Sequence, residues 1–195
     1  MNTLKAEKRD MTTKAKKLRR EGYVTGVIYG REMAESIPLK IEKPAVERIL
    51  KTNGKGSQVM LEVDGQTYDA LIKEIDFDTL KGQLLEIDFQ ALVSNEKVHS
   101  VAEIILLNHE AVQGGVIQQM LQEVSYRALP AALIDKIRVD VSSMKVGDIL
   151  KVEDLDIAKN PDIDLQTPLD AVIATVIEVH NAPAEDEGEE DTSEA

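Results

Sequence analysis

The chain has 195 residues and a formal net charge of −13, yet its first 20 residues carry eight Lys or Arg against two acidic residues, a net charge of +6. It contains no cysteine, which excludes disulfides and thiolate metal sites. No apolar run reaches the ~20 residues that span a bilayer, and the charged N-terminus lacks the apolar stretch of a signal peptide, so we expect a cytoplasmic protein with no membrane contact.

The first half of the sequence predicts a small β-rich module. Thr12 or Thr13 is expected to cap a short helix over residues 14–20, which Gly22 ends. Pro44 suits the first turn of a second helix that extends to Thr52. Short apolar or alternating runs predict strands over residues 4–9, 24–29, 36–41, 59–63, 67–75 and 84–92.

Two sequence signals refine this module. Asp64-Gly65 separates two of the expected strands and predicts a tight hairpin turn. In the second helix, Val46, Ile49 and Leu50 are expected to point inward.

The second half is also β-rich. Strands are expected over residues 101–107, 137–141, 149–152 and 171–179, with an amphipathic stretch over 116–128 and turns at 114–115, 130–133 and 146–148. Their spacing is typical of an antiparallel β-sandwich or barrel-like module. Residues 185–194 then carry seven acidic side chains, a composition that cannot bury enough apolar surface to fold.

A step in charge supports two domains. Residues 1–91 hold 16 basic and 15 acidic groups, net +1, whereas residues 92–195 hold 7 and 21, net −14. We therefore expect a mainly β protein with a small N-terminal barrel carrying two short helices, an antiparallel β-domain and a disordered acidic tail. The expected boundaries are residues 1–92, 93–181 and 182–195.

Candidate catalytic and metal-binding residues are few. His99, His109 and His180 are scattered without the spacing of metal ligands. The carboxylate pairs Asp76/Asp78 and Glu86/Asp88 are spaced i, i+2 along strands and are expected to face solvent. The sequence therefore predicts no enzyme, no cofactor and no metal.

The basic arm, residues 1–20, is the strongest functional signal. On a helix, Lys14, Lys17 and Arg20 would share one face, with Lys16 and Arg19 beside it, which suits contact with phosphates. The alternatives are an arm for an acidic protein or an anionic lipid surface. Rings that could stack on bases are scarce, so recognition of nucleic acid by shape and backbone is favoured.

Two short motifs and an ordered series of others connect the chain to a known family. Lys16-Lys-Leu-Arg-Arg-Glu-Gly22 followed by Gly26-Val-Ile-Tyr-Gly30 resembles the N-terminal signature of the bacterial ribosomal proteins of the Ctc (large-subunit twenty-five) family. The second half resembles the C-terminal β-domain of that family. The matching motifs are Gly114-Gly-Val-Ile, Leu129-Pro-Ala, Val139-Asp-Val-Ser-Ser, Val146-Gly-Asp and Asp154-Leu. The order of these motifs matches over residues 3–180.

The resemblance implies a non-catalytic protein that binds 5S ribosomal RNA in the central protuberance of the large subunit. It implies phosphate contacts from the basic residues of the arm, namely Arg9, Lys14, Lys16, Lys17, Arg19 and Arg20. Tyr29, with Arg31 beside it, would lie at the RNA face, and Asp88 would occupy the acidic position of the last barrel strand. The C-terminal half would contact ribosomal surface or protein, and the chain would be a monomer off the ribosome.

The sequence departs from the family where RNA should approach. The usual His-Val-Asp-Phe of the last barrel strand is Glu86-Ile-Asp-Phe89 here, and Thr25 replaces a common proline. Glu74, Asp76 and Asp78 add further negative charge, which would weaken RNA binding or pair with the arm. The alternative function is therefore a stress-related relative with weakened RNA binding that acts as a protein-interaction module.

Overall fold

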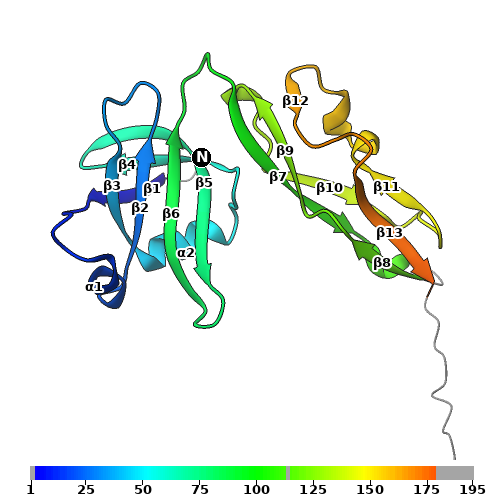
Figure 1. The fold of residues 1–195 in the computed structure, drawn as a ribbon, viewed down its shortest axis with the longest axis horizontal. Helices are drawn as coiled ribbons and strands as arrows, with labels where there is room; N and C mark the ends of the chain where they lie inside the picture. Colours follow the sequence, from blue (N-terminus) through cyan, green and yellow to red (C-terminus); the bar gives the residue numbers. More distant parts are fainter. Residues whose placement is uncertain (1–2, 113–114, 179–195) are drawn as a thin grey trace, which may run out of the picture.

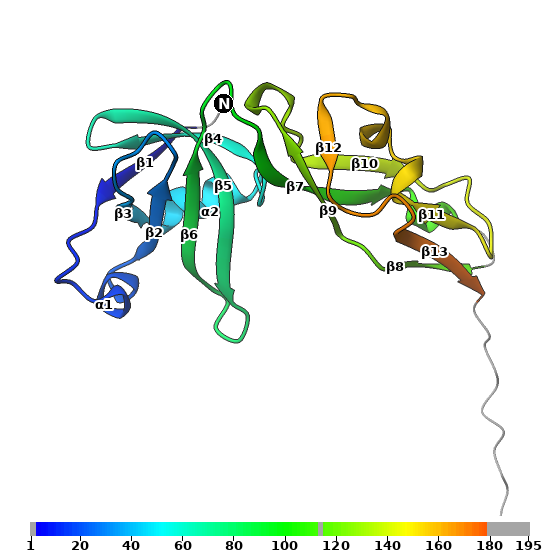
Figure 2. The ribbon, with the colours of Figure 1, turned by 45° about the horizontal axis from the view of Figure 1, so that its top comes forward.

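A computed structural model describes residues 3–112 and 115–178 of the chain. It is mostly strand with two short α-helices, so the expected fold class is confirmed. Figures 1 and 2 show two parts side by side, a barrel built from the first half and an elongated C-terminal half. We use "C-terminal half" below for residues 93–178.

Six strands close the barrel in the order β1-β3-β2-β6-β5-β4. They are β1 (Thr3–Lys8), β2 (Tyr23–Tyr29), β3 (Ile37–Glu42), β4 (Gln58–Val63), β5 (Gln66–Asp78) and β6 (Gln83–Ala91). Each strand expected from the sequence is present, with small shifts at its ends. The pairs β1–β4 and β2–β6 are parallel, and the other neighbours are antiparallel.

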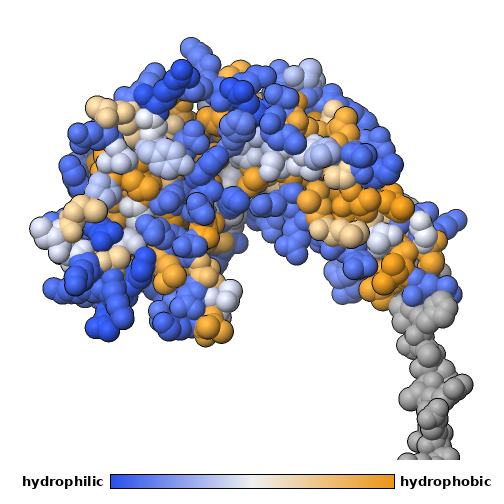
Figure 3. Space-filling model, viewed as in Figure 1, coloured by the Kyte–Doolittle hydropathy of each residue, from blue (hydrophilic) through white to orange (hydrophobic). Residues whose placement is uncertain are grey.

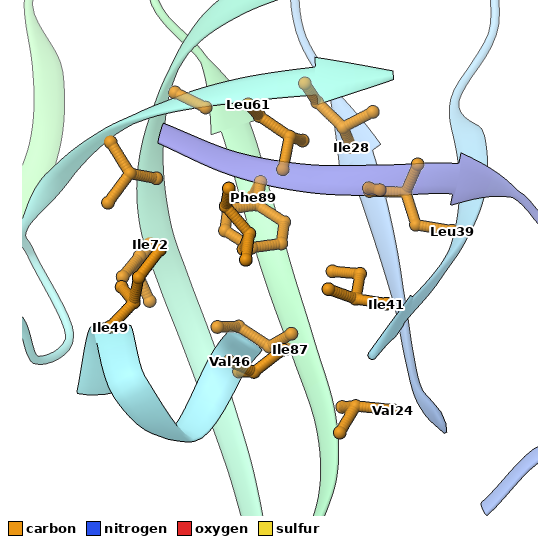
Figure 4. Close-up of a cluster of buried hydrophobic side chains, with 14 of the residues drawn as sticks. Val24, Ile28, Leu39, Ile41, Val46, Ile49, Leu61, Ile72, Ile87 and Phe89 are labelled. Atoms are coloured by element: carbon orange, nitrogen blue, oxygen red, sulfur yellow. The ribbon is translucent and has the colours of Figure 1, made fainter. Parts of the chain in front are cut away.

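Apolar and polar residues alternate along the strands, so the apolar side chains point into the barrel and fill it. Inward side chains from all six strands surround the ring of Phe89, and Figure 4 shows α2 (Lys43–Leu50) adding Val46 and Ile49 to this core. Pro44 lies in the first turn of α2, as expected, because its missing N–H needs no partner there. The inward face expected for the second helix is therefore confirmed.

The turn and cap predictions had different outcomes. Asp64 and Gly65 adopt φ values of 48° and 85°, the left-handed backbone of a two-residue hairpin turn between β4 and β5. The predicted cap at Thr12 or Thr13 is wrong, because α1 (Ala15–Arg20) begins after Lys14, whose side chain makes no capping bond. Thr12 instead bonds back to Asp10 through its N–H and hydroxyl.

The C-terminal half contains two sheets. One has the order β10-β7-β9-β12 and the other β11-β13-β8. The strands are β7 (Val98–Leu107), β8 (Gly115–Gln119), β9 (Glu123–Ala128), β10 (Lys136–Asp140), β11 (Ile149–Lys151), β12 (Ile163–Leu165) and β13 (Val172–Glu178). Both sheets contribute side chains to one hydrophobic cluster around Tyr126. This arrangement corresponds to the sandwich-like alternative predicted for the second half.

Three details of this half differ from expectation. The pair β7–β10 is parallel, so the half is not wholly antiparallel. The amphipathic stretch 116–128 divides into β8 and β9, which belong to different sheets. Strand β12 was not predicted. Single-turn 3-10 helices occupy His109–Ala111, Pro130–Ala132, Val152–Asp154 and Asp156–Lys159.

Other predictions fall on residues outside the described ranges. These are the turn at Gly114, the last residue of the strand expected over 171–179, and the disordered tail over 182–195. The boundary at residue 92 stays a prediction, supported by separate hydrophobic clusters before and after it. Within residues 3–112 and 115–178, no helix is long and apolar enough to cross a bilayer.

Polar contacts tie the barrel to the C-terminal half. Ser57 Oγ donates a hydrogen bond to Asp135 Oδ2 at 3.1 Å, and Lys73 Nζ donates to the His99 carbonyl at 2.8 Å. Gly56 lies so close to this boundary that a Cβ there would fall 2.0 Å from the Val101 carbonyl oxygen. The two parts therefore meet directly, backbone against backbone.

Candidate nucleic-acid interface

The outer face of three adjacent strands, β2, β6 and β5, carries the polar residues singled out from the sequence. Side chains of a strand alternate between faces, so Val24 and Ile28 enter the core while Thr25, Val27 and Tyr29 lie on the outer face. The register sets Thr25 opposite Glu86 and Val27 opposite Asp88 on β6. On the other side of β6, Asp88 lies opposite Glu74 and Glu86 opposite Asp76 on β5.

These four carboxylates form one cluster, the acidic quartet: Glu74, Asp76, Glu86 and Asp88. They line a shallow hollow of about 180 Å³ on the outer face. Glu74 and Asp76 are exposed, whereas Glu86 and Asp88 are partly buried. The expectation that the strand carboxylates simply face solvent is therefore too simple, because across β5 and β6 they face one another.

Asp88 has the most constrained environment of the quartet. Its Oδ1 accepts a hydrogen bond from the Val27 N–H at 3.1 Å, which favours the carboxylate. Burial and the negative charge of Glu86, with smaller contributions from Glu74 and Asp76, outweigh this bond and raise the pKa of Asp88. Burial, then Asp88 and Glu74, also raise the pKa of Tyr29.

The helix α1 carries the basic arm against one end of this face. Its single buried side chain, Leu18, packs the helix onto the barrel and leaves the other positions at the surface. Four exposed cations lie on α1 or directly before it: Lys14, Lys16, Lys17 and Arg20. Figure 3 shows hydrophilic residues covering the α1 end of the barrel. Of these four, Lys17 is paired only loosely, at 3.8 Å from Glu21.

Arg19 differs from its neighbours because its side chain points inward. Its Nε donates to the Leu85 carbonyl at 2.9 Å and its Nη2 to Thr25 Oγ1 at 3.1 Å. The same Nη2 lies 3.8 Å from Glu86 Oε2. Arg19 therefore joins α1, β2 and β6, and the arm is paired with the acidic quartet through this residue.

The remaining predicted residues are spread along the barrel. Arg9 is half-buried and donates from Nη2 to the Thr13 carbonyl at 3.1 Å, which braces the loop before α1. Tyr29, 37% exposed, and Arg31 lie at the far end of β2, where Tyr29 is about 13 Å at strand spacing from Thr25, the residue that Arg19 contacts. The Nη1 atom of Arg31 is 2.6 Å from Glu96 Oε1, in the segment between β6 and β7.

The structure thus brings the exposed cations and Arg19 to one end of the face, sets Tyr29 and Arg31 at the other, and places Asp88 between them. A surface of this length, with cations along one edge and a ring at its far end, can follow a nucleic-acid backbone. In the described ranges, no group of three or more His, Asp or Glu side chains has the arrangement of a metal site. Val27 is a contributor that the sequence analysis did not name, and Thr25 was named only as the replacement of a common proline; strand alternation is the signal that places both on this face.

Comparison with known proteins covers both halves of the chain. Residues 4–89 match the ribosomal L25p family, and residues 97–180 match the C-terminal domain of ribosomal protein TL5. Relatives named large ribosomal subunit protein bL25 occur in Thermoanaerobacter sp. (strain X514) and in Listeria monocytogenes serotype 4b (strain F2365). They are each 32% identical, over 96% and 99% of this chain and 92% and 91% of their own lengths.

The protein of the same name from Enterococcus faecalis (strain ATCC 700802 / V583) is 30% identical over 88% of this chain and 84% of its own length. Similarity that extends through both halves at this identity reflects common descent, and the family consists of ribosomal proteins rather than enzymes. The closed barrel and the C-terminal sheets described above therefore belong to a member of the ribosomal L25p family, in its long two-domain form.

Proposed function

We propose that this protein binds 5S ribosomal RNA in the central protuberance of the large ribosomal subunit. The observation that carries this proposal is the gathering of exposed cations on α1 at the edge of the β2–β6 face, within an otherwise acidic chain. Its relatives are named as proteins of the large ribosomal subunit. The protein would then act in the cytoplasm without catalysis, and as a monomer when off the ribosome.

Within this proposal the residues have different roles. Lys14, Lys16, Lys17 and Arg20 are free to approach phosphates, because their side chains lie at the surface. Arg9 and Arg19 would hold α1 and its preceding loop in place, and contact RNA only with the part of the guanidinium left exposed. Tyr29 would offer a ring at the far end of the face, with Arg31 beside it and Asp88 between.

The acidic quartet favours a second candidate function. Four carboxylates on the same face repel phosphates, at a cost of roughly 1 kcal/mol for each close and partly desolvated approach. A stress-related relative with weakened RNA affinity, which binds protein instead, would retain the same fold. The two functions differ in one quantity, the selective affinity for 5S ribosomal RNA.

That affinity is measured by fluorescence anisotropy with labelled 5S ribosomal RNA at physiological salt, with transfer RNA as competitor. We expect nanomolar, selective binding that weakens steeply as salt rises. Binding that is micromolar or equally strong for transfer RNA would contradict the RNA proposal and favour the protein-binding alternative.

A charge-matched pair of variants locates the interface. Replacing Lys16 and Arg20 by Ala should weaken binding and lower the salt slope by about one unit for each phosphate that is no longer neutralised. Replacing Lys145 and Lys159 by Ala, both exposed on the C-terminal half, changes the net charge equally and should leave the slope unchanged. Equal effects of the two pairs would show that only the total charge matters and would remove α1 from the site.

A further inference from the structure

We propose that the C-terminal half binds an extended, lysine- or arginine-rich segment of another protein as an added β-strand between β7 and β8. These strands belong to different sheets and are not paired with one another. Between them lies a groove of about 590 Å³, walled mainly by aliphatic side chains that include Ile105, Leu106, Val112 and Val116. Figure 2 shows β8 along the lower margin of the C-terminal half, below β7.

The backbone of β8 presents an open edge to this groove. Ile117 lies opposite Val176 of β13. The N–H of Val176 donates to the Asp148 carbonyl and its carbonyl accepts from the Gly147 N–H, both on the side away from β8. In an antiparallel pair the two opposite residues either exchange both bonds or neither, so the N–H and carbonyl of Ile117 point away from β13, into the groove.

The backbone of β7 presents a second open edge. Glu103 and Leu107 bond on the β10 side, to Asp135 and Val141, so the alternate residues Ile104 and Leu106 direct their backbone groups to the other side. There β9 pairs with β7 as far as Glu103, and the Ile104 N–H donates to the Gln122 carbonyl at 2.8 Å, so the open positions begin beyond Ile104. In the part of the chain that the structure describes, no strand pairs with Leu106 on that side.

One contact shows how this edge accepts a donor. The side-chain Nε2 of Gln119 donates to the Ile104 carbonyl at 3.2 Å and to the Leu121 carbonyl at 3.1 Å. A side-chain amide from β8 therefore occupies, at one end of the groove, the place that a backbone N–H of an intervening strand would take. Beyond that point the amide ladder is open.

The two strands are too far apart to pair directly with one another. Neighbouring strands lie about 4.8 Å apart, so an intervening strand needs about 9.6 Å between its neighbours. The Cα atoms of β7 and β8 are almost everywhere more than 8 Å apart. Addition of an extended segment to open sheet edges is a general mode of peptide recognition, in which backbone bonds supply affinity and flanking side chains supply selectivity.

Charge identifies the chemistry of the segment. Glu103 and Glu110 line the groove, both are exposed, and neither has an ion-pair partner among the described residues. Residues 93–178 carry 14 acidic and 7 basic side chains, a net charge of −7. The negative charge of this half repels RNA and the chain's own acidic residues 185–194. A cationic segment with alternating aliphatic residues would instead pack against the aliphatic walls of the groove and be attracted by its negative charge.

The test uses the full-length protein and an acetylated, amidated peptide, Lys-Ile-Lys-Val-Lys-Ile-Lys, with hydrogen exchange of individual amides followed by NMR. At ten times its Kd, the peptide should slow exchange of the Leu106 and Ile117 amides about tenfold, because exchange then requires release of the strand. The same peptide N-methylated at valine, which cannot pair, should not bind, and a peptide with glutamate in place of lysine should bind at least tenfold more weakly.

Two variants connect binding to the groove. Ile117→Pro removes the groove-side N–H from an edge strand without breaking a bond to β13, and should abolish peptide protection. Should that variant not fold, Glu103→Gln combined with Glu110→Gln should weaken the lysine peptide severalfold and reduce its salt dependence. Protein binding by this groove is overturned if the N-methylated peptide binds equally or if exchange at the two amides does not change. It is also overturned if 5S ribosomal RNA protects these amides, or if removal of residues 179–195 exposes them.

Discussion

Arg19 and Thr25 are joined by a hydrogen bond of 3.1 Å from Nη2 to Oγ1, at the place where α1 meets the barrel. Thr25 is fully buried, so its hydroxyl needs a partner, and the guanidinium supplies one while its Nε bonds the Leu85 carbonyl. Arg19, one of the cations expected from the sequence to contact phosphates, thus has a structural role. Among the basic residues of α1, Arg19 fixes the helix to the barrel, whereas Lys16, Lys17 and Arg20 have exposed side chains.

Arg19→Ala should therefore destabilise the barrel, whereas Arg20→Ala should not. Loss of hydrogen bonds from a charged donor to partly buried acceptors costs about 2 kcal/mol, and exposed Arg20 should cost less than about 0.5 kcal/mol. Urea denaturation followed by circular dichroism gives both values. Equal free energies of unfolding for the two variants would mean that the Arg19 contacts do not stabilise the fold.

Glu86→Gln should tighten binding of 5S ribosomal RNA. The substitution removes one negative charge from the face and leaves a side chain of the same size, so roughly 1 kcal/mol of repulsion is relieved, about fivefold in affinity. Glu47→Gln on the exposed surface of α2 removes the same charge elsewhere on the barrel. If both variants bind like the parent chain, Glu86 lies outside the RNA interface.

Asp88→Asn should stabilise the protein at neutral pH. Burial and the neighbouring carboxylates raise the pKa of Asp88 above its ordinary value of 3.8, so the folded state favours the protonated form. The protonated Asp88 therefore contributes a stabilisation of the folded state that is fully present below pH 3.8. This stabilisation is lost as the pH rises through the raised pKa of Asp88 in the folded protein. Asparagine is always neutral and its Oδ1 can still accept from the Val27 N–H.

The pH dependence separates this explanation from a general gain in packing. Urea midpoints of the parent chain and of Asp88→Asn should differ at pH 7 and converge below pH 3.8. A difference that persists unchanged at acid pH would show that the ionisation of Asp88 is not its cause.

Gly26→Ala should disrupt the barrel. A Cβ at this position would lie 2.0 Å from the Ile87 carbonyl oxygen on the neighbouring strand β6, so the strands would have to separate. We expect a loss of about 3 kcal/mol in the free energy of unfolding. Gly54→Ala is the matched control, since nothing lies within 4 Å of the added methyl group, and its effect should be small. A tolerated alanine at residue 26 would contradict the close approach of β2 and β6.

Local signals predicted most of the strands, but not contacts between distant residues. Alternation and the Asp64-Gly65 turn are properties of neighbouring residues, so β4 and β5 could be placed closely. The inward turn of Arg19 depends on Leu85, 66 residues away, and the facing of Glu74 with Asp88 depends on the register of two strands. The sequence therefore offered pairing of the carboxylates with the arm as one alternative, but it could not identify Arg19 and Glu86 as the residues that meet.

The errors in the C-terminal half have a similar cause. Strand β12 has three residues, and only its pairing with β9 defines it. The parallel pairing of β7 with β10 brings together segments that are separated by the whole of β8 and β9, which spacing along the sequence cannot indicate. Apolar runs fix the existence of a strand, whereas the tertiary core chooses its partner.

Tyr126→Phe tests how the second hydrophobic cluster is organised. The ring of Tyr126 is fully buried, and its hydroxyl donates to the Ile134 carbonyl at 2.7 Å while accepting from the Ile134 N–H at 2.7 Å. Phenylalanine fills the same space but leaves both backbone groups without this partner, at a cost of about 3 kcal/mol. Tyr68→Phe in the barrel, where the ring is only partly buried, should cost much less. Urea denaturation that reports each half separately should show the loss for Tyr126→Phe only in the C-terminal half. An unchanged midpoint would mean that solvent reaches Ile134 and that the hydroxyl does not hold this loop against the sheet.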